Sequence, residues 1–448
     1  MPFAARQRAL HRGVVRGRPG VLEEPGRPGG APVSDVLDYA AVGVGPANLS
    51  LAALGADVEN LRSVHFEARP GFSWHPGLLL PEATLQVSPL KDLVTLVDPT
   101  SRYSFLAFLA NEGRLYQFLT AKFPAVLRAE FDQYLQWASR SIPSIEFGAE
   151  VRGIRVRAGR SSDGHSSDGH FVLDTGRGEV TARNVVLGTG QTPFVPGFLR
   201  PHLGADVFHA EEFLSRPREL PGRAVAVIGG GQSGAEIVRH LMRLDDPPRS
   251  ITWITRRPGF LPMDDSPFTN EYFFPAYARE FHGLPQPDKR ELLAEQKYAS
   301  DGIDLATLQD VYRERYRHEC LLGRKDWLRL MPRSEVTGCA RLSDGWELEV
   351  RGPHAPVVRS DVVVLATGYE YRLPDCMAEL APHLARTPDG LVVGDDYALS
   401  LDLRTSGRVF LQNGARHAWG IADPNLSLLA WRSAVILNAI LGYRRYNT

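Results

Sequence analysis

The stretch DYAAVGVGPANLS at residues 38–50 decides the fold class of this chain. Its apolar run at residues 39–42 predicts a buried parallel strand, and the residues after the glycines predict a helix that begins near Leu49. Between them lies a G-x-G-x-x-N form of the dinucleotide fingerprint. In this motif one glycine permits a tight turn, and the next lets the backbone approach a pyrophosphate at the helix N-terminus. The predicted cofactor contacts of this loop are Gly43, Gly45, Pro46 and Asn48.

A single loop of this kind also occurs as an ordinary turn, so the prediction depends on two further features. The apolar run at residues 63–66 ends in Glu67, the position of a carboxylate that binds an adenosine ribose. RAVAVIGGGQSGAE at residues 223–236 repeats the pattern, with a strand predicted at residues 224–228. Two fingerprints on one chain predict two dinucleotides, the first of them FAD. The predicted cofactor contacts of the second loop are Gly229, Gly231, Gln232, Ser233 and Gly234.

The composition is that of an ordinary globular protein and excludes several classes of function. With 448 residues, 43% hydrophobic and 23% charged, the chain suits two or three domains with sizeable cores. The net charge of −1 gives no electrostatic reason to bind nucleic acid or an anionic membrane surface. No apolar run reaches the ~18 residues of a membrane span. Cys320, Cys339 and Cys376 form no C-x-x-C pair, which favours a reducing, cytoplasmic setting.

Two strands that end in glycine divide the chain into domains. NVVLGTG at residues 184–190 and DVVVLATGY at residues 361–369 are typical of strands that connect a FAD domain with a nicotinamide domain. Gly368 is therefore a predicted cofactor contact. The predicted fold is α/β, with two Rossmann-like domains and a small, mostly helical substrate-binding region. The predicted parts are a disordered tail at residues 1–37, a FAD-binding domain at residues 38–216 and 361–448, and an inserted NADPH-binding domain at residues 217–360.

Several segments are expected to lie outside regular elements. Residues 1–37 are rich in Arg, Pro and Gly and lack the apolar core of a secretory signal, so a disordered tail is predicted, with a functional basic arm as the alternative. Residues 69–100 are too long and too rich in Pro for a simple connector and predict a functional loop. SSDGH occurs twice at residues 161–170, which predicts an exposed hairpin loop. Helices are predicted at residues 104–109, 128–140 and 425–441.

The end of the second strand of the inserted domain indicates which nicotinamide cofactor binds. This strand is predicted at residues 250–254 and is followed by Thr255, Arg256 and Arg257. NAD sites place an acidic residue there, whereas arginines suit the 2′-phosphate of NADPH. Arg256 and Arg257 are therefore predicted to bind NADPH, with plain surface charge as the alternative for either.

Two dinucleotides predict that electrons pass from NADPH to FAD and then to a further acceptor. A disulfide reductase needs a cysteine pair beside the flavin, and this sequence has no closely spaced pair. Oxygen is the natural remaining acceptor, because a dry flavin site can hold a C(4a)-hydroperoxide long enough to oxygenate a nucleophile. No metal site and no protein nucleophile are predicted.

Longer motifs resemble those of the microbial N-hydroxylating flavin monooxygenases, in that family's order and spacing, over residues 38–442. They are FSWHPGLLLPEATLQVSPLKDLVTLVDPTSRYSFLAFL, GGGQSGAE, DDSPFTNEYF, LATGY and NLSLLAWRSA. The resemblance implies N-hydroxylation of lysine, ornithine or a related diamine for hydroxamate siderophores or similar products. EQKYASDGI and FTNEYFFPAY are similar to the lysine N6-hydroxylase branch. Ornithine hydroxylases usually have N-Y-S where this chain has Ala299-Ser300-Asp301.

The resemblance also implies roles for particular residues. Lys91 matches the family lysine that pairs with the substrate carboxylate, Asn270 an amide that holds the amino acid, and Ser427 a substrate-proximal serine. Their structural alternatives are a helix-surface lysine, a turn-capping asparagine and a helix N-cap. Gln232 resembles a glutamine beside the nicotinamide and flavin, and with Lys91 and Asn270 it forms the expected catalytic set. The segment expected to line the isoalloxazine contributes Trp74, His75 and Gln86, with core packing as the alternative for the tryptophan.

The reaction implied by the resemblance uses FAD, NADPH, O₂ and free L-lysine. NADPH reduces the flavin, reduced flavin captures oxygen, and the neutral ε-amine attacks the distal oxygen to give N-hydroxylysine. Because the free amine has a pKa near ~10.4, the site must favour its neutral form. Ornithine, cadaverine and putrescine are alternative substrates, and an NADPH oxidase is the rival from another class. The resemblance further suggests a homo-oligomer.

Overall fold

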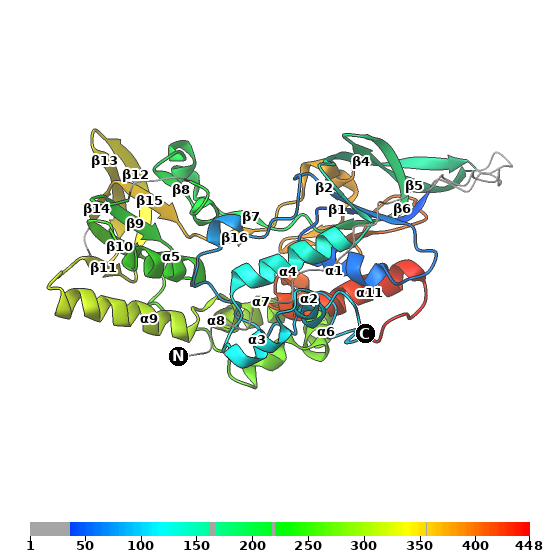
Figure 1. Ribbon diagram of the computed structural model, residues 1–448. Coiled ribbons are helices and arrows are strands. Elements are labelled where there is room, and N and C mark those ends of the chain that lie inside the picture. Colours follow the sequence, from blue (N-terminus) through cyan, green and yellow to red (C-terminus); the bar gives the residue numbers. More distant parts are fainter. Residues whose placement is uncertain (1–35, 161–165, 217–219, 355) are drawn as a thin grey trace, which may run out of the picture. The chain divides into compact units, whose positions relative to one another are not determined.

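The computed structural model describes residues 36–160, 166–216, 220–354 and 356–448 (Figure 1). The predicted tail lies outside the described residues, except that Leu37 already belongs to the first strand. The first copy of SSDGH, residues 161–165, lies outside them as well. The second copy, residues 166–170, begins a strand, because backbone pairing of the hairpin continues as far as Arg160 and Ser166. The prediction of a loop at residues 166–170 is therefore wrong.

The first sheet contains seven strands among the described residues, with the strand of the first fingerprint near its centre. β1 (Leu37–Val42) pairs in parallel with β2 (Ser63–Glu67) on one side and β6 (Gly178–Leu187) on the other. Because the last four residues of β1 are buried, the strand has a continuous apolar sequence. The other strands are β3 (Ile145–Phe147) and β19 (Val409–Leu411), both parallel to their neighbours, and the antiparallel β4 (Val151–Arg160) and β5 (Ser166–Thr175).

Helix α1 (Pro46–Gly55) begins directly at the glycine loop, three residues before the predicted start at Leu49. Pro46 has the fixed φ that suits the first helical position, where no hydrogen-bond donor is needed, and this explains the earlier start. α1 packs against α4 (Arg128–Ser141) and α11 (Leu429–Leu441), and the three helices share a core with β1. The other predicted helices are confirmed as α2 (Phe105–Asn111), α4 and α11, the last preceded by a 3₁₀ turn, η8 (Leu426–Leu428).

The second sheet carries the second fingerprint. Its described strands are parallel and lie in the order β11-β10-β9-β15-β8. β9 (Ala224–Ile228) and β10 (Ser250–Ile254) have the predicted bounds, and β11 (Leu328–Met331) completes that side. β8 (Val207–His209) and β15 (Val362–Leu365) belong to this sheet too. The second domain therefore extends beyond the expected limits of 217 and 360 at both ends.

Different elements cover the two faces of the second sheet. Val225 and Val227 of β9 contribute to a core shared with α5 (Gln232–Met242) and α9 (Leu305–Tyr316). Ala226 contributes to a second core, shared with a small antiparallel sheet that the sequence did not predict. Alternation along β9 thus explains how one apolar strand serves two layers. The small sheet consists of β12 (Glu335–Leu342), β13 (Gly345–Arg351) and β14 (Val357–Ser360).

A mostly helical segment separates β10 from β11 in the sequence. Phe273 and Ala278, from η4 (Thr269–Phe273) and α6 (Pro275–Gly283), join the core of the first sheet. The part of the segment that contains η4 and α6 therefore packs on the first domain, whereas α9 packs on the second. Among the described helices, none is both long enough and apolar enough to cross a membrane. Between α6 and α9 the segment also forms α7 (Gln286–Glu295) and α8 (Lys297–Asp301).

The chain crosses between the two sheets twice, and the crossing segments pair with each other. β7 (Thr192–Pro193) leads away from the first sheet and β16 (Tyr369–Glu370) leads back, and together they form a short antiparallel ladder (Figure 1). Each follows one of the two T-G segments, so these segments lie where the chain passes from one sheet to the other.

Candidate functional site

A cavity of about 1040 Å³ lies where the two glycine loops meet. It is at the upper end of the size of cofactor sites, and both domains contribute to its walls. The predicted site residues that line it are Gly43, Gly45, Pro46, Glu67, Trp74, His75, Gln86, Gln232 and Ser233. The predicted site residues outside its lining are Asn48, Lys91, Gly229, Gly231, Gly234, Arg256, Arg257, Asn270, Gly368 and Ser427.

The first glycine loop has the geometry of an anion site. Gly43 has a φ of +83°, and a Cβ there would lie 2.8 Å from the carbonyl oxygen of Gly188, so both conformation and space require glycine. Gly45 is different, because the nearest heavy atom to its Cβ position lies 4.0 Å away. Gly45 caps α1 without a side-chain hydrogen bond, so the first N–H groups of α1 are available to an anionic group.

Asn48 supports this loop from beneath. Its side chain is fully buried, donates to the carbonyl oxygens of Gly43 at 2.8 Å and Val42 at 3.2 Å, and accepts from Gln412 Nε2 at 2.9 Å. These bonds occupy the amide at both ends. The side chain of Asn48 therefore holds the loop, and the contact of this residue with a cofactor stays a prediction.

Glu67 lies at the end of β2 and lines the cavity, as the motif predicts. Its carboxylate accepts from the backbone N–H of Val44 at 2.9 Å and from Arg69 Nε at 2.9 Å. Burial alone would raise the pKa of Glu67, but the hydrogen bonds from Arg69 and Val44 outweigh it and lower the pKa. The group is therefore an ionised acceptor, which suits a ribose hydroxyl.

The second loop is the more tightly packed of the two. A Cβ at Gly229, where φ is +140°, would lie 1.9 Å from the carbonyl oxygen of Ala366, and one at Gly234 would lie 2.4 Å from that of Gly229. Gly231 has no heavy atom within 4 Å of its Cβ position, and Gly368 has none either. Tight backbone on one side and open space on the other leave room for a ligand to approach the start of α5.

The two predicted phosphate-binding arginines have different environments. Arg257 Nη1 donates to the carbonyl oxygens of Gly230 at 3.0 Å and Asp301 at 2.7 Å, so it braces the second loop against α8. Arg256 is exposed, and within the described part of the chain it makes no hydrogen bond or ion pair. Arg256 is thus the guanidinium available to a phosphate, whereas Arg257 already has partners.

The loop at residues 69–100 supplies a neutral, partly aromatic wall. Trp74 and His75 line the cavity, and burial, with smaller effects of Arg128 and Arg69, lowers the pKa of His75 to about 4. The His75 ring lies 6.2 Å from that of Tyr369, centroid to centroid. The buried hydroxyl of Tyr369 has no hydrogen-bond partner among the described residues, so it is available to a bound group.

Lys91 and Ser427 meet across 336 positions of sequence. Lys91 Nζ donates to Ser427 Oγ at 3.0 Å, and Ser427 Oγ donates to Asn425 Oδ1 at 2.8 Å. No carboxylate in the described residues forms an ion pair with Lys91, and burial lowers its pKa. Asn425 lines the main cavity, so this cation lies just behind the cavity wall without a counter-ion.

Asn270 makes no hydrogen bond to Lys91 or Ser427 among the described residues. Its Nδ2 donates to the carbonyl oxygen of Asp265 at 2.8 Å. It precedes Phe273 by three positions in η4, and residues so spaced in a 3₁₀ helix lie on one side. Lys91 Nζ lies 5.8 Å from the centroid of the Phe273 ring. Asn270 thus belongs to the 3₁₀ helix whose Phe273 faces Lys91, and its own side chain makes a turn-stabilising bond.

Tyr369, Asn425 and Arg128 are among the cavity residues that were not identified from the sequence. Tyr369 directly follows the predicted Gly368, and Asn425 lies in the motif of Ser427, so both had a signal in the sequence. Arg128 had none, because its place in the cavity wall depends on how α4 packs. Among the described residues, no group of three or more His, Cys, Asp or Glu side chains could hold a metal ion.

Comparison with known proteins gives a match over most of the chain. A sequence model of the L-lysine 6-monooxygenase/L-ornithine 5-monooxygenase family matches residues 35–371. L-lysine N6-monooxygenase of Escherichia coli is 38% identical over 411 residues, which cover 91% of this chain and 95% of that protein.

Two solved structures are also similar. A cadaverine monooxygenase of the desferrioxamine pathway of Erwinia amylovora, bound to FAD, has a TM-score of 0.84 and 30% identity, covering 92% of this chain and 96% of its own. An ornithine N-hydroxylase from Kutzneria sp. 744, solved with reduced FAD, NADP⁺ and L-ornithine, has a TM-score of 0.83 and 34% identity, covering 91% and 99%.

Proposed function

This chain belongs to the L-lysine 6-monooxygenase/L-ornithine 5-monooxygenase family, a family of flavin-dependent N-hydroxylases, and we propose that it hydroxylates the side-chain amine of free L-lysine. The product, N-hydroxylysine, would serve a hydroxamate siderophore or a related natural product. Members of the family use FAD and NADPH. When bound, these cofactors supply reducing equivalents and activated oxygen for transfer to an amine.

The residues of the cavity fit both cofactors. On the FAD side, the open space at Gly45, the uncapped start of α1 and the ionised Glu67 suit a pyrophosphate and a ribose. On the NADPH side, the open space at Gly231 and the exposed Arg256 suit a pyrophosphate and a 2′-phosphate. The free hydroxyl of Tyr369 and the neutral ring of His75 are available to whatever group occupies the space between the loops.

Lys91 is the observation that carries the choice of an amino acid as substrate. It is a half-buried cation without a carboxylate partner, held by Ser427 next to the cavity lining. A half-buried ammonium without a counter-ion is unfavourable unless a ligand supplies one. The carboxylate of an amino acid would do so, whereas a diamine has none and would add a second cation. The site therefore favours lysine or ornithine over cadaverine or putrescine.

The choice of lysine over ornithine rests on sequence. The Escherichia coli relative that acts on lysine is 38% identical. Residues 299–301 read Ala-Ser-Asp instead of the N-Y-S that is usual in ornithine hydroxylases. These residues belong to α8 and reach Arg416 and Arg257 through Asp301. Ornithine thus remains the leading rival, and a substrate panel decides between them.

The amine must be neutral to react. A free lysine ε-amine has a pKa near ~10.4, and burial disfavours its charged form. The contribution of the protein here is to exclude water and to bind the carboxylate end, so that the amine end extends toward the aromatic wall. No side chain is assigned as a base.

The first experiment replaces Lys91. Lys91→Ala should abolish hydroxylation of lysine but leave NADPH oxidation measurable, now with release of peroxide. Loss of the cation leaves the substrate carboxylate unpaired, which costs about 2–5 kcal/mol in comparable pairs. FAD content should stay near wild type, because Lys91 lies outside both glycine loops. Lys325→Ala, at an exposed position, is the matched control and should behave as wild type.

Two results would contradict this assignment. Wild-type affinity for lysine in Lys91→Ala would place the carboxylate anchor elsewhere. Loss of FAD would mean that Lys91 serves the fold or the cofactor site.

The second experiment compares lysine, ornithine, cadaverine and putrescine side by side, with detection of the hydroxylamine product. Turnover of lysine well above the others is expected. Turnover of ornithine or a diamine without lysine would overturn the choice of substrate. Oxygen consumption that yields only peroxide with every amine would instead identify an NADPH oxidase.

The proposal also includes a cytoplasmic setting and a homo-oligomer. Cys320, Cys339 and Cys376 are free thiols, which suits a reducing compartment. Fractionation of cells and light scattering of the purified protein would test these two points.

A further inference from the structure

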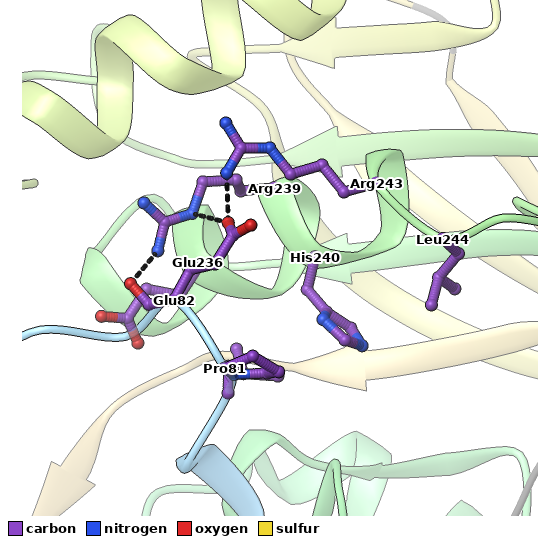
Figure 2. Close-up of a pocket in the computed structure, with 8 residues that line it drawn as sticks. Pro81, Glu82, Glu236, Arg239, His240, Arg243 and Leu244 are labelled. Carbon is purple, nitrogen blue, oxygen red and sulfur yellow. Dashed lines mark hydrogen bonds and ion pairs between the residues drawn. The ribbon is translucent and has the colours of Figure 1, made fainter. Parts of the chain in front are cut away.

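Glu236 is a buried carboxylate outside the main cavity, one helical turn after Gln232 on α5. Only 1% of the residue is exposed. It lines a smaller cavity of about 180 Å³ between α5 and the residues that follow η1 (Pro76–Leu78) (Figure 2). Because a buried charge is costly unless it is paired and hydrogen-bonded, the partners of Glu236 indicate its purpose.

One partner comes from the first domain. Arg128, the first residue of α4, donates to the two carboxylate oxygens of Glu236 at 2.8 and 3.0 Å, a bidentate ion pair. The same guanidinium donates to the carbonyl oxygen of Leu78 at 3.0 Å. Arg128 and Leu78 both line the main cavity. The ion pair therefore connects α5 of the second domain to the cavity wall that the first domain provides.

The other partner is Gln232, which lines the main cavity. Gln232 Nε2 donates to Glu236 Oε1 at 2.9 Å, and Gln232 Oε1 accepts from the backbone N–H of Asp304 at 2.8 Å. A flipped amide would set its oxygen against the carboxylate and its NH₂ against an N–H, so both contacts would become repulsive. An ionised Glu236 therefore leaves the Gln232 amide one orientation.

We propose that Glu236 is a positioning residue for the transfer of hydride from NADPH. It acts through Gln232 and Arg128, and holds the start of α5 in a fixed relation to the wall of the cavity formed by the first domain. Glu236 itself contacts neither cofactor nor substrate. The inference rests on the proposed use of FAD and NADPH and is independent of which amine is hydroxylated.

Other ion pairs across the same boundary make the role of Glu236 separable. Arg239 of α5 and Arg243, the residue that follows α5, both reach the carboxylate of Glu82, and Arg239 also donates to the Glu82 carbonyl oxygen at 2.7 Å (Figure 2). None of these contacts involves Glu236. A substitution of Glu236 should therefore leave α5 attached to the first domain and change only the local orientation at its start.

The test uses full-length Glu236→Gln and Arg128→Lys. Glutamine has one acceptor oxygen where three donors converge, and lysine keeps the charge at position 128 but cannot bind in a bidentate manner. Asp389→Asn is the matched control, because Asp389 accepts a bidentate pair from Arg290 at 2.7 and 2.8 Å and lies outside the cavity lining. If Glu236→Gln does not fold, Arg128→Lys alone tests the proposal.

One readout does not depend on activity. The Asp304 amide hydrogen is held by Gln232, so its exchange with solvent reports the orientation of that side chain. In both variants this exchange should accelerate by about tenfold. Anaerobic reduction of the flavin by NADPH should slow by about tenfold to a hundredfold, as for a small misplacement of reacting groups. FAD content and the KM for lysine should not change.

Three results would overturn the proposal. Wild-type exchange at Asp304 and wild-type flavin reduction in both variants would show that Glu236 positions nothing. Loss of FAD together with a raised KM for lysine would show a general role in folding. The same changes in Asp389→Asn would show that they are not specific to α5. Failure of lysine as substrate would leave this result intact, since flavin reduction is measured without an amine.

Discussion

The two glycine loops solve the same packing problem in different ways. In the second loop, a Cβ at Gly234 would lie 2.4 Å from the carbonyl oxygen of Gly229, so the helix can approach the strand only if the third motif residue is glycine. In the first loop the third residue is Asn48, and its amide fills the space and bonds to the carbonyl oxygens of Val42 and Gly43.

The room for Asn48 comes from a glycine on a neighbouring strand segment. A Cβ at Gly188 would lie 2.4 Å from Asn48 Nδ2. The requirement for a small residue has therefore moved from the helix to the end of β6, and a polar bridge replaces direct backbone contact. The third glycine of the fingerprint thus serves to leave space between helix and strand. A glycine at another position, here Gly188, can provide that space instead.

The largest effect on stability is expected when the asparagine of the first loop is introduced at the third motif position of the second loop. Gly234→Asn places a side chain against the Gly229 carbonyl and should destabilise the second domain by about 3 kcal/mol. Binding of NADP⁺, measured by titration, should be lost while FAD stays bound. Gly231→Ala is the stability control, because nothing lies within 4 Å of its Cβ position. A normal unfolding midpoint for Gly234→Asn would show that the second loop can relax as the first one has.

The two sheets also differ in the strand that lies beside the fingerprint strand, because only the first sheet has a buried histidine there. His65 on β2 is fully buried between Tyr39 and Ser144, and burial lowers its pKa from 6.5 to about 4. The corresponding strand of the second sheet is β10, which pairs with β9 and carries the buried Trp253, a side chain that does not titrate. Between pH 6.5 and 4 the unfolded chain binds the extra proton, so stability falls with falling pH, by about 3 kcal/mol from this group.

Urea unfolding at several pH values in this range, for wild type and His65→Gln, measures that effect. The variant should lose less stability on acidification than wild type does. The transition of the first domain should move toward lower urea concentration as the pH falls. Parallel pH profiles for the two proteins would contradict the assignment.

A smaller effect is expected when the first loop is given the residue of the second. Asn48→Gly removes the bridge to Val42, Gly43 and Gln412 and leaves buried polar groups without partners, which should cost about 2 kcal/mol. FAD should bind more weakly, because Gly43 is no longer held. Thermal unfolding and FAD titration check both points. Asn48→Asp, which keeps the acceptor for Gln412 but loses the donors, separates the two halves of the bridge.

The smallest effect concerns the charged residue at or shortly after the end of the second strand of each domain. Glu67 in the first domain suits a ribose, whereas Arg256 in the second suits a phosphate. Arg256→Ala should weaken NADPH binding by about 1.5 kcal/mol, seen as a higher KM for NADPH. The KM for NADH should stay nearly unchanged. Arg257→Ala should weaken both cofactors, because it releases Gly230 and Asp301. Equal losses with both cofactors in Arg256→Ala would count against its role.

The elements that could be predicted are those whose signal is local. β9 and β10 have the predicted bounds because each is a short apolar run between turn residues. The earlier start of α1 depends only on Pro46 and was also within reach of the sequence. The sheet of β12, β13 and β14 was missed although β13 has the alternation of a half-buried strand, with Trp346, Leu348 and Val350 buried, so this element too was within reach of the sequence.

The parts of the site that could not be predicted depend on distant partners. Arg256 and Arg257 are chemically equal in the sequence, and only the positions of Gly230 and Asp301 distinguish them. Asn48 matched a cofactor-binding position, but its amide is used by Gln412, 364 positions away. The meeting of Lys91 with Ser427 followed from family resemblance, because no local pattern relates two residues so far apart.

The ladder of β7 and β16 has a consequence for how this architecture can be assembled and altered. The chain leaves the first domain at Pro193 and returns at Tyr369, and these two residues are paired neighbours. The two ends of the intervening stretch therefore lie side by side, which suits the exchange of a whole nicotinamide domain. The stretch also contains η4 and α6, whose Phe273 and Ala278 belong to the core of the first sheet. A foreign nicotinamide domain could therefore take its place only in a chimera that keeps η4 and α6.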